Sequence, residues 1–494
     1  MAEMLKGCRL MKKKSLGLNA FLNGIRSVLN LLFPLLTFPY VSRILGATGM
    51  GKYNFANSIV SYFLMIAALG INTYAVREGA RIRDDRKKFS NFASQIFSYN
   101  IVSTVVSYVL LFFCLAIFKN LQDYKTAILI FSVQVFFTTI GIEWIYEVYE
   151  EYVYITIRSI IFKLISIVLL FLLVRHQNDY LNYAAVTVFS SVGSNVLNFV
   201  HSRKICDIRL TLNIDWKKHT GPIFIIFASS IAAQVYVSSD ITLLGIFKND
   251  YVVGIYSVSS KIYNIIKNLV QAVVVVTVPR LSMLLGQRHI PEFKALLRRV
   301  TDTLALLTIP STVGVFMLAP QIILIISGKE YLRGVSSLRL LCPALAISVF
   351  SWVFAFCILM PLKKEKKFLI ATIASGVLNI GLNLILIPLM SENGAAITTS
   401  LAEILMFGMM VYYCKDTING IFDWIFWRDI LSYLIGAFTI VPICIGVNAI
   451  FKSTIVQLLF ATAVSVIVYG TVLLLCGNSI LKDALNSLKM RLNK

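Results

Sequence analysis

The sequence predicts an all-α membrane protein of about 14 transmembrane helices, arranged as two six-helix lobes followed by two extra C-terminal helices. Three observations support this prediction: the apolar composition, a regular succession of apolar segments, and a motif that occurs twice. Of the 494 residues, 58% are hydrophobic and only 14% are charged. The mean hydropathy is +0.79. Because about 25% of the residues in a soluble domain are charged, a soluble fold is excluded.

Segments of roughly twenty apolar residues, enough to cross about 30 Å of hydrocarbon as a helix, recur along the chain with short breaks. We expect the spans near residues 20–43, 54–76, 95–118, 126–147, 152–174, 180–202, 221–247, 253–278, 300–319, 336–360, 368–390, 394–415, 430–450 and 454–476.

Basic residues concentrate in alternate loops, at residues 77–88, 203–218, 280–299, 363–367 and 482–494. Cytoplasmic loops of membrane proteins carry this excess of Lys and Arg, so we expect both termini in the cytoplasm. The same bias explains most of the net charge of +22, and nucleic acid is not expected as a partner.

Enzyme and metal signatures are missing from the sequence. The eight cysteines are scattered, without the C-x-x-C spacing of a zinc or redox site. Phosphate-binding loops, hydrolase elbows and zinc-binding helix motifs do not occur either. We therefore expect a transporter without metal or cofactor, driven by a gradient of Na⁺ or H⁺ or by consumption of its product.

A short motif occurs twice, six predicted spans apart. Gly51-Lys52-Tyr53 is followed by Ile59, and Gly254-Ile255-Tyr256 is followed at the same spacing by Ile262. An offset of six spans preserves orientation, which predicts a parallel repeat with the substrate site between two lobes. Chance similarity between two apolar hairpins is the alternative. The expected division is an N-lobe at residues 1–204, a cytoplasmic linker at 205–220, a C-lobe at 221–416, and a final hairpin with a cytoplasmic tail at 417–494.

Charged residues within the spans are mostly cations. A charge at bilayer depth costs several kcal/mol unless it faces a bundle interior or a watery cavity, so the excess of cations predicts an anionic passenger. For Arg158, the alternative is an extended side chain that reaches the interface, or pairing with Glu143 or Glu147. The candidate cationic site consists of Arg26, Lys261, Lys267, Arg158 and Lys163.

Polar residues share helical faces with two of these cations. Asn23 and Asn30 lie three and four residues from Arg26, and Asn264 lies three residues from Lys261, so each set shares one face of a helix. Such residues predict a wet cavity, although single Asn or Ser side chains also hold helices together. The predicted cavity lining is Asn23, Asn30, Asn264, Asn268, Gln271, Gln234, Asn198, Asn379 and Asn383.

Three acids also fall within predicted spans: Asp240, Glu403 and Glu143. Buried carboxylates can carry a proton or help to bind Na⁺, so these residues are candidates for ion coupling. The alternative for each is a structural ion pair with an Arg or Lys of a neighbouring helix.

Two blocks of the sequence resemble a known family. The first is Thr37-Phe-Pro-Tyr-Val-Ser-Arg-Ile-Leu-Gly46 with Gly49-Met-Gly-Lys-Tyr-Asn-Phe-Ala-Asn-Ser-Ile-Val-Ser-Tyr-Phe63, continued by Leu69-Gly-Ile71 and Tyr74-Ala-Val-Arg-Glu78. The second is Leu386-Ile-Pro388 with Gly394-Ala-Ala-Ile-Thr-Thr399 and Glu403. Both resemble the bacterial O-antigen flippases (Wzx-type) of the multidrug/oligosaccharidyl-lipid/polysaccharide exporter superfamily.

The resemblance implies two six-helix lobes and alternating access in the cytoplasmic membrane of a bacterium. It implies that an undecaprenyl-diphosphate-linked oligosaccharide is turned from the inner to the outer leaflet for surface polysaccharide synthesis. Membrane lipids, a polysaccharide polymerase and chain-length proteins are the implied partners. A lipid II flippase is the nearest alternative, and a cation-coupled drug antiporter would instead need a negatively charged cavity. A membrane-embedded glycan polymerase would need a long outer loop with catalytic residues.

Overall fold

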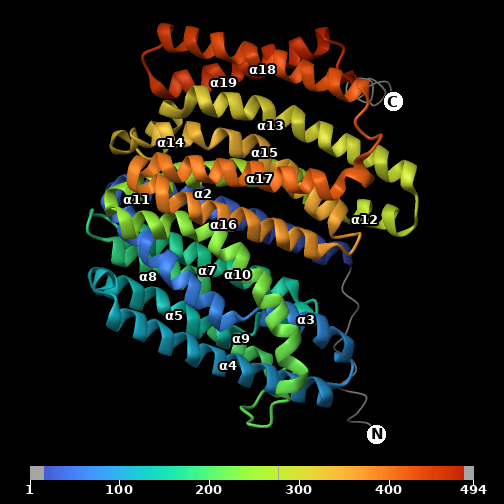
Figure 1. Cartoon of the computed structure of the whole chain (residues 1–494). Helices are drawn as coiled ribbons and strands as arrows, with labels where there is room; N and C mark the ends of the chain where they lie inside the picture. Colours follow the sequence, from blue (N-terminus) through green and yellow to red (C-terminus); the bar gives the residue numbers. More distant parts are fainter. Residues whose placement is uncertain (1–15, 276, 483–494) are drawn as a thin grey trace. The chain divides into compact units, whose positions relative to one another are not determined.

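The structure is a computed structural model that describes the backbone of residues 16–275 and 277–482. Side chains are described from Leu36 onward, apart from those of residues 229, 232, 233, 273 and 275. Every regular element in these ranges is helical, which confirms the predicted class (Figure 1). The helices are α2 (Leu16–Ala68), α3 (Ile71–Ile82), α4 (Arg86–Ile117), α5 (Lys125–Gly141), α6 (Glu143–Val148), α7 (Tyr152–Leu173), α8 (Tyr180–Val192), α9 (Asn195–Ser202), α10 (Trp216–Phe247), α11 (Asp250–Val275), α12 (Val278–Gly286), α13 (Ile290–Ile326), α14 (Gly334–Leu340), α15 (Cys342–Val353), α16 (Glu365–Met390), α17 (Glu392–Ile418), α18 (Trp424–Ile450) and α19 (Thr454–Leu475), with short helical turns at Lys119–Tyr124, Lys329–Tyr331 and Phe354–Leu359.

In the described part of the chain, 11 helical segments are long and apolar enough to cross a membrane. The predicted spans 20–43 and 54–76 meet within α2, which kinks at Gly46 instead of ending in a loop. The second span continues into α3 after a break at residues 69–70. The backbone of Gly46 is left-handed, with φ of 65°, a conformation that favours glycine. The predicted spans 221–247 and 253–278 correspond to α10 and α11, which are not among these 11 segments of the described chain. Within α10, Gln234–Phe247 is a shorter apolar helix.

The chain forms two compact units. Unit 1 contains the residues up to Leu45 together with Lys52–Ser238, and unit 2 contains Gly46–Gly51 and the residues from Ser239 onward. The predicted linker at residues 205–220 thus lies within unit 1. The short segment Gly46–Gly51 packs with unit 2, although the chain on both sides of it belongs to unit 1.

Unit 1 is built around aromatic residues of α3, α4 and α6. Phe89 and Phe92 of α4 lie 6.0 and 6.1 Å from the ring of Trp144. These rings belong to a buried cluster with Tyr74 and Ile145. Burying each large ring removes apolar surface from solvent at about 25 cal/mol per Å², so this cluster holds the ends of the three helices together.

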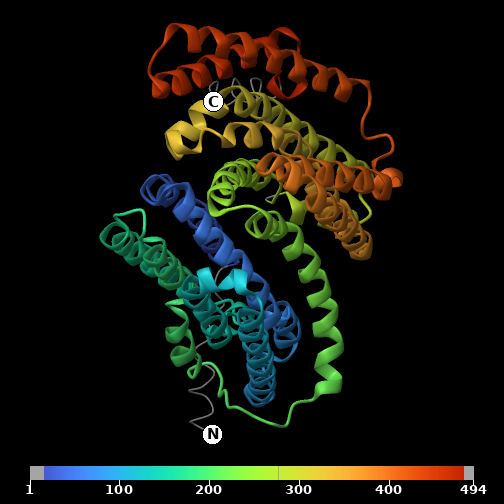
Figure 2. The same ribbon diagram turned by 60° about the vertical axis from the view of Figure 1, so that its left-hand side comes forward.

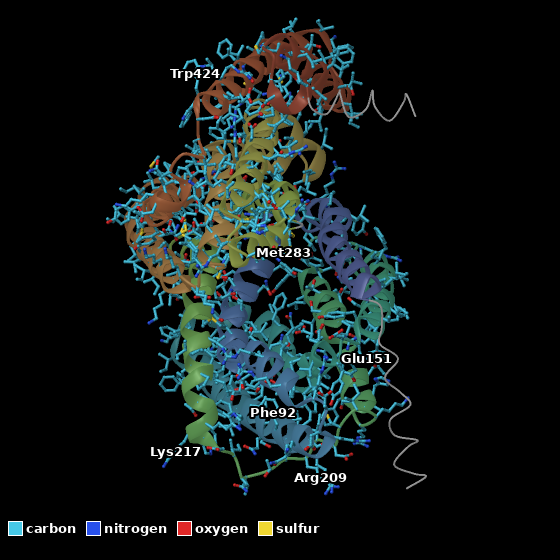
Figure 3. The ribbon with its side chains drawn as sticks, turned by 90° about the vertical axis from the view of Figure 1, so that its right-hand side faces the viewer. Phe92, Glu151, Arg209, Lys217, Met283 and Trp424 are labelled. Carbon is cyan, nitrogen blue, oxygen red and sulfur yellow. The ribbon has the colours of Figure 1, made fainter. Side chains whose placement is uncertain are left out.

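The chain that joins α9 to α10 is held along α4 by its backbone (Figure 2). Every second amide of the chain donates to every fourth residue of α4, which is a serine. Two residues of extended chain advance by about 6.6 Å and four residues of helix by about 6.0 Å, so the two repeats match. The bonds run from the amides of Asp207, Arg209 and Thr211 to the hydroxyls of Ser90, Ser94 and Ser98, at 3.1, 3.1 and 2.9 Å. Figure 3 shows Arg209 and Lys217 at the same end of unit 1.

Unit 2 packs around α13, which lies beside α15 on one side and the α18–α19 hairpin on the other (Figure 1). The hairpin contributes Ala437, Ile440 and Cys444 to a buried cluster with Leu318 of α13. The hydroxyl of Tyr433 also donates to Asp302 Oδ1 at 2.7 Å. The predicted final hairpin is therefore an integral part of the packing of unit 2.

The segment Gly46–Gly51 crosses the start of α11 with almost no space between the backbones. A Cβ at Gly51 would lie 1.8 Å from the carbonyl oxygen of Asp250, and a Cβ at Gly254 would lie 1.8 Å from that of Ala47. Ala47 and Asp250 are separated along the chain by the same number of residues as Gly51 and Gly254. The two contacts are therefore equivalent in the two copies of the sequence motif. The repeated glycines thus face each other across a pseudo-symmetric helix crossing, which only glycine at both positions allows.

Candidate functional site

Two polar clusters in unit 2 lie along the contact between α11 and α17. The first surrounds Asp240 of α10, whose side chain is 7% exposed. Its Oδ1 accepts a hydrogen bond from Asn383 Nδ2 at 2.6 Å, and its Oδ2 accepts from the hydroxyls of Tyr256 at 2.5 Å and Thr399 at 2.6 Å. No lysine or arginine among the described side chains lies within ion-pair distance of this carboxylate.

A second layer of polar groups holds these donors in place. Asn379 Oδ1 accepts from Asn383 Nδ2 at 3.0 Å and from the Ser239 hydroxyl at 3.0 Å. The Thr398 hydroxyl donates to Asn383 Oδ1 at 2.5 Å. The predicted lining residues Asn379 and Asn383 are therefore buried, and both belong to the hydrogen-bond network around the Asp240 carboxylate.

The second cluster is an ion pair between α11 and α17. Lys267 Nζ lies 2.9 Å from Glu403 Oε1, and the Tyr263 hydroxyl accepts from Lys267 at 3.2 Å while donating to Glu403 at 3.4 Å. Glu403 is 5% exposed. For Glu403 the structure shows the ion pair that was the alternative to a coupling role, and its partner is the predicted cation Lys267.

Lys261 differs from Lys267 although it lies less than two helical turns away. It is half-buried on α11, and no acidic group among the described side chains lies within ion-pair distance of its ammonium. Asn264 and Asn268, which follow it on the predicted face, are exposed. Gln271 ends this face as a buried side chain whose Nε2 has no hydrogen-bond partner in the described structure.

The predicted residues of unit 1 occupy different surroundings. Arg158 is 7% exposed; its Nη1 lies 3.4 Å from the carbonyl oxygen of Ser194, and its guanidinium lies 5.9 Å from the centre of the Tyr154 ring. Lys163 is half-buried on the same helix. Arg158 is thus buried and packed against a ring, and its predicted role and the alternatives to it stay predictions.

Three other predicted residues of unit 1 lie elsewhere in the unit. Gln234 Nε2 donates to the hydroxyls of Ser61 and Ser238 at 3.0 and 2.7 Å. Asn198 is fully buried, and neither its side-chain nitrogen nor its oxygen has a partner in the described structure. Glu143 lines a separate cavity with Glu147. The side chains of Arg26, Asn23 and Asn30 lie outside the described residues.

Sequence periodicity missed the tyrosines and threonines that complete the two clusters. Tyr256 and Tyr263 are seven residues apart, and Thr399 lies four residues before Glu403, so each pair falls on one helical face. This spacing was a usable signal. It was overlooked because tyrosine and threonine are common in apolar spans and carry no charge to mark them.

Comparison with known proteins gives the family of this chain. The Polysaccharide biosynthesis protein family matches residues 16–285, more than half of the sequence. A relative in Escherichia coli K12, named "Putative O-antigen transporter", is 24% identical over 407 residues, which cover 82% of this chain and 98% of the relative. A relative in Haloferax volcanii, named "Probable low-salt glycan biosynthesis flippase Agl15", is 25% identical over 50% of this chain and 52% of its own length.

Solved structures show the fold. The lipid II flippase MurJ in an inward closed conformation matches with a TM-score of 0.73 and 17% identity, covering 95% of this chain and 99% of that one. An inward-facing multidrug resistance transporter of the MATE family, itself described as a member of the MOP superfamily, matches with a TM-score of 0.59 and 14% identity, covering 80% of this chain and 98% of that one. This chain is a multi-pass membrane protein of the Polysaccharide biosynthesis protein family with the fold of these exporters, as the resemblance of Thr37–Phe63 to the Wzx-type flippases implied.

Proposed function

We propose that this protein moves an undecaprenyl-diphosphate-linked oligosaccharide from the inner to the outer leaflet of a bacterial cytoplasmic membrane by alternating access. The family membership and the relatives named as an O-antigen transporter and a glycan flippase support a glycan cargo. The proposal that the cargo carries an anionic group rests on Lys261, whose half-buried ammonium has no acidic partner among the described side chains.

Lys261 is suited to a phosphate because its charge is not already neutralised. An ammonium binds phosphate as a compact point charge, and Asn264 and Asn268 extend the same face with groups that hydrogen-bond to sugar hydroxyls. Lys267 is neutralised by Glu403 at 2.9 Å and is the weaker candidate. Arg26 remains a predicted second cation for the diphosphate.

Asp240 is the proposed coupling site. Its carboxylate is buried within unit 2 and surrounded by neutral hydrogen-bond donors. Binding of a proton or a Na⁺ ion would therefore neutralise its negative charge without breaking an ion pair. Cargo consumption by a polymerase on the outer face would complete the cycle. Both termini then lie in the cytoplasm, as the distribution of basic loops predicts.

The test is export of lipid-linked repeat units in cells that make the cargo but lack their own flippase. We expect Lys261→Ala to raise the cytoplasmic-leaflet pool about tenfold, because one charge-assisted phosphate contact of about 1.5–3 kcal/mol is lost. Lys261→Arg should retain most export because it keeps the positive charge. Lys452→Ala, in the short connection between α18 and α19, is the matched control.

Equal export by Lys261→Ala and the wild type, at equal protein level, would remove the phosphate role of Lys261. A parallel arm supplies lipid II to cells depleted of their lipid II flippase. Rescue in that arm, without export of the oligosaccharide, would replace the proposed cargo with lipid II.

A further inference from the structure

The linker between α9 and α10 exposes two leucines at the surface of unit 1. Leu212 is fully exposed and Leu210 is 70% exposed. Ile208 and Ile214, on either side of them, instead pack against the buried aromatic cluster of unit 1. A single exposed leucine on a protein surface needs no explanation. Two neighbouring ones at the depth described next do, because the linker also has a buried place for apolar side chains.

The linker carries these leucines along α4 toward the apolar part of that helix (Figure 2). The amide of Thr211, between the two leucines, donates to the Ser98 hydroxyl at 2.9 Å. Val102 is the first exposed large apolar residue of α4, and it follows Ser98 by four residues, about 6 Å along the helix. Since α4 is long and apolar enough to cross a membrane, the leucines lie about one helical turn from the surface that meets hydrocarbon.

Two aromatic rings lie at the same depth. Trp216, the first residue of α10, is exposed, and its ring centre lies 4.9 Å from that of Tyr99, the residue after Ser98. Tryptophan and tyrosine are enriched where hydrocarbon meets water, because each has an apolar ring and a polar group. These rings therefore indicate the membrane–water interface at the level of the two leucines.

The charges around the leucines are mostly positive. Residues 203–218 contain five basic residues and two acids. Asp207 lies 3.9 Å from Arg86, and Asp215 Oδ1 accepts from the backbone amide of Lys218 at the start of α10. All five basic side chains are exposed, and none forms an ion pair within the described part of the chain. The basic residues are Arg203, Lys204, Arg209, Lys217 and Lys218.

We propose that the linker is a membrane-surface anchor: Leu210, Leu212 and Trp216 enter the cytoplasmic leaflet, and the surrounding basic residues bind the phosphates of anionic lipids. Apolar side chains flanked by Lys and Arg bind such a surface by burial and by charge together. The basic loops predict that this end of unit 1 faces the cytoplasm. The inference goes beyond the proposed function and does not depend on the identity of the cargo.

The experiment places the photo-crosslinking residue p-benzoyl-phenylalanine at position 212 of the full-length protein. The protein is reconstituted in nanodiscs of phosphatidylcholine mixed equally with phosphatidylglycerol, and adducts are identified by mass spectrometry. Position 212 should form lipid adducts. Position 84, an exposed site in the turn before α4, is the matched control, and its lipid adducts should be lost because it lies on the water side of the linker.

A second arm tests the charge. Arg209→Gln with Lys217→Gln should reduce the preference of position 212 for phosphatidylglycerol over phosphatidylcholine, about fivefold for each cation removed. Lys119→Gln with Lys125→Gln also removes two exposed cations from unit 1, at the opposite end of α4. This control pair should leave the preference unchanged.

A third arm keeps the test valid if the photo-crosslinking protein fails to fold. Leu212→Cys in nanodiscs should react with a hydrophilic maleimide more slowly than Asp84→Cys, because lipid covers position 212. Mass spectrometry of the two peptides separates these sites from the native cysteines.

Equal yields of lipid adducts at positions 212 and 84 would overturn the inference, and so would equal maleimide rates at the two cysteines. Equal adducts with the two lipids would overturn the assignment of an anionic surface. The same photo-crosslinker in intact cells tests the other class of partner. Adducts of position 212 with a protein and none with lipid would replace the membrane anchor with a protein-docking site.

Discussion

At the scale of single residues, two lysines of one helix differ because of what the neighbouring helix presents. Lys267 meets Glu403 of α17, whereas Lys261 has no acid within reach among the described side chains. A buried ion pair that loses one partner leaves an uncompensated charge. Replacing Lys267 should therefore affect mainly stability, and replacing Lys261 should affect mainly transport.

Lys267→Met should lower the free energy of unfolding by about 2 kcal/mol or more, because Glu403 is left buried without its cation. The double variant Lys267→Met/Glu403→Gln should recover most of this loss, since Gln removes the stranded charge and can still accept from Tyr263. Thermal unfolding in detergent is the measurement. Lys261→Met is the matched control on the same helix and should change stability by no more than about 0.5 kcal/mol. A Lys267→Met protein as stable as this control would contradict the structural role of the pair.

At the scale of elements, two contacts are set by matching repeats along the chain. In the linker between α9 and α10, every second backbone amide donates to one of three serines that are spaced by four residues on α4. The crossing of Gly46–Gly51 with α11 matches one copy of the sequence motif to the other. Hydropathy analysis does not reveal either contact, because serine and glycine have hydropathies near zero.

Cys206 reports on whether the linker is docked. It is fully buried, and burial, with a smaller contribution from Asp207, raises the pKa of its thiol to about 12. Because the thiolate is the reactive species, we expect Cys206 to resist maleimide at pH 8, where the exposed Cys476 reacts. Ser94→Ala should speed the labelling of Cys206, since the linker loses a hydroxyl that accepts from Arg209. Labelling would be followed by mass spectrometry of the Cys206 peptide. Unchanged protection in Ser94→Ala and in a triple Ser90, Ser94 and Ser98 to Ala variant would show that the serines do not hold the linker.

The glycine crossing predicts a steric effect. Gly254→Ala places a Cβ 1.8 Å from the Ala47 carbonyl oxygen, so α2 and α11 must move apart and the unfolding temperature should fall. Gly446→Ala is the matched control, because its Cβ meets nothing within 4 Å. That variant should be neutral or stabilised by up to about 1 kcal/mol through helix propensity. Equal stability of the two alanine variants would rule out close packing at the crossing.

At the scale of the whole molecule, the polar clusters of unit 2 are assembled from several helices. Residues distant in sequence meet at these sites. Asp240 and Thr399 are 159 positions apart, and Lys267 and Glu403 are 136 apart. Both clusters therefore depend on the folding of unit 2 as a body rather than on any single span.

Asp240→Asn tests the coupling role at this scale. Asn cannot change its charge with a proton or neutralise Na⁺, so transport should lose its dependence on the imposed gradient while cargo binding is retained. Inside-out vesicles under separate Na⁺ and proton gradients provide the measurement, with Glu403→Gln as the comparison. Wild-type transport that ignores both gradients would remove the coupling role of Asp240.

Much of the fold and part of the candidate site follow from the sequence. The apolar segments predicted the helical class, and the motif at Gly51 and Gly254 predicted two related halves. Periodicity identified Asn379 and Asn383 as polar positions on one helical face, and the structure places both at the carboxylate of Asp240. Periodicity could not predict that Lys267 would be paired and Lys261 not, because both lie on the same polar side of one helix.

By itself, the sequence determined the helical class, the intramembrane charges and the family, since these depend on local composition and on motifs. Only the tertiary structure decided which of the described charges are paired and that side chains from α3, α4 and α6 line one cavity in unit 1. The physical reason is that helical periodicity specifies the face on which a side chain lies, whereas ion pairing and cavity formation depend on which helix packs against that face.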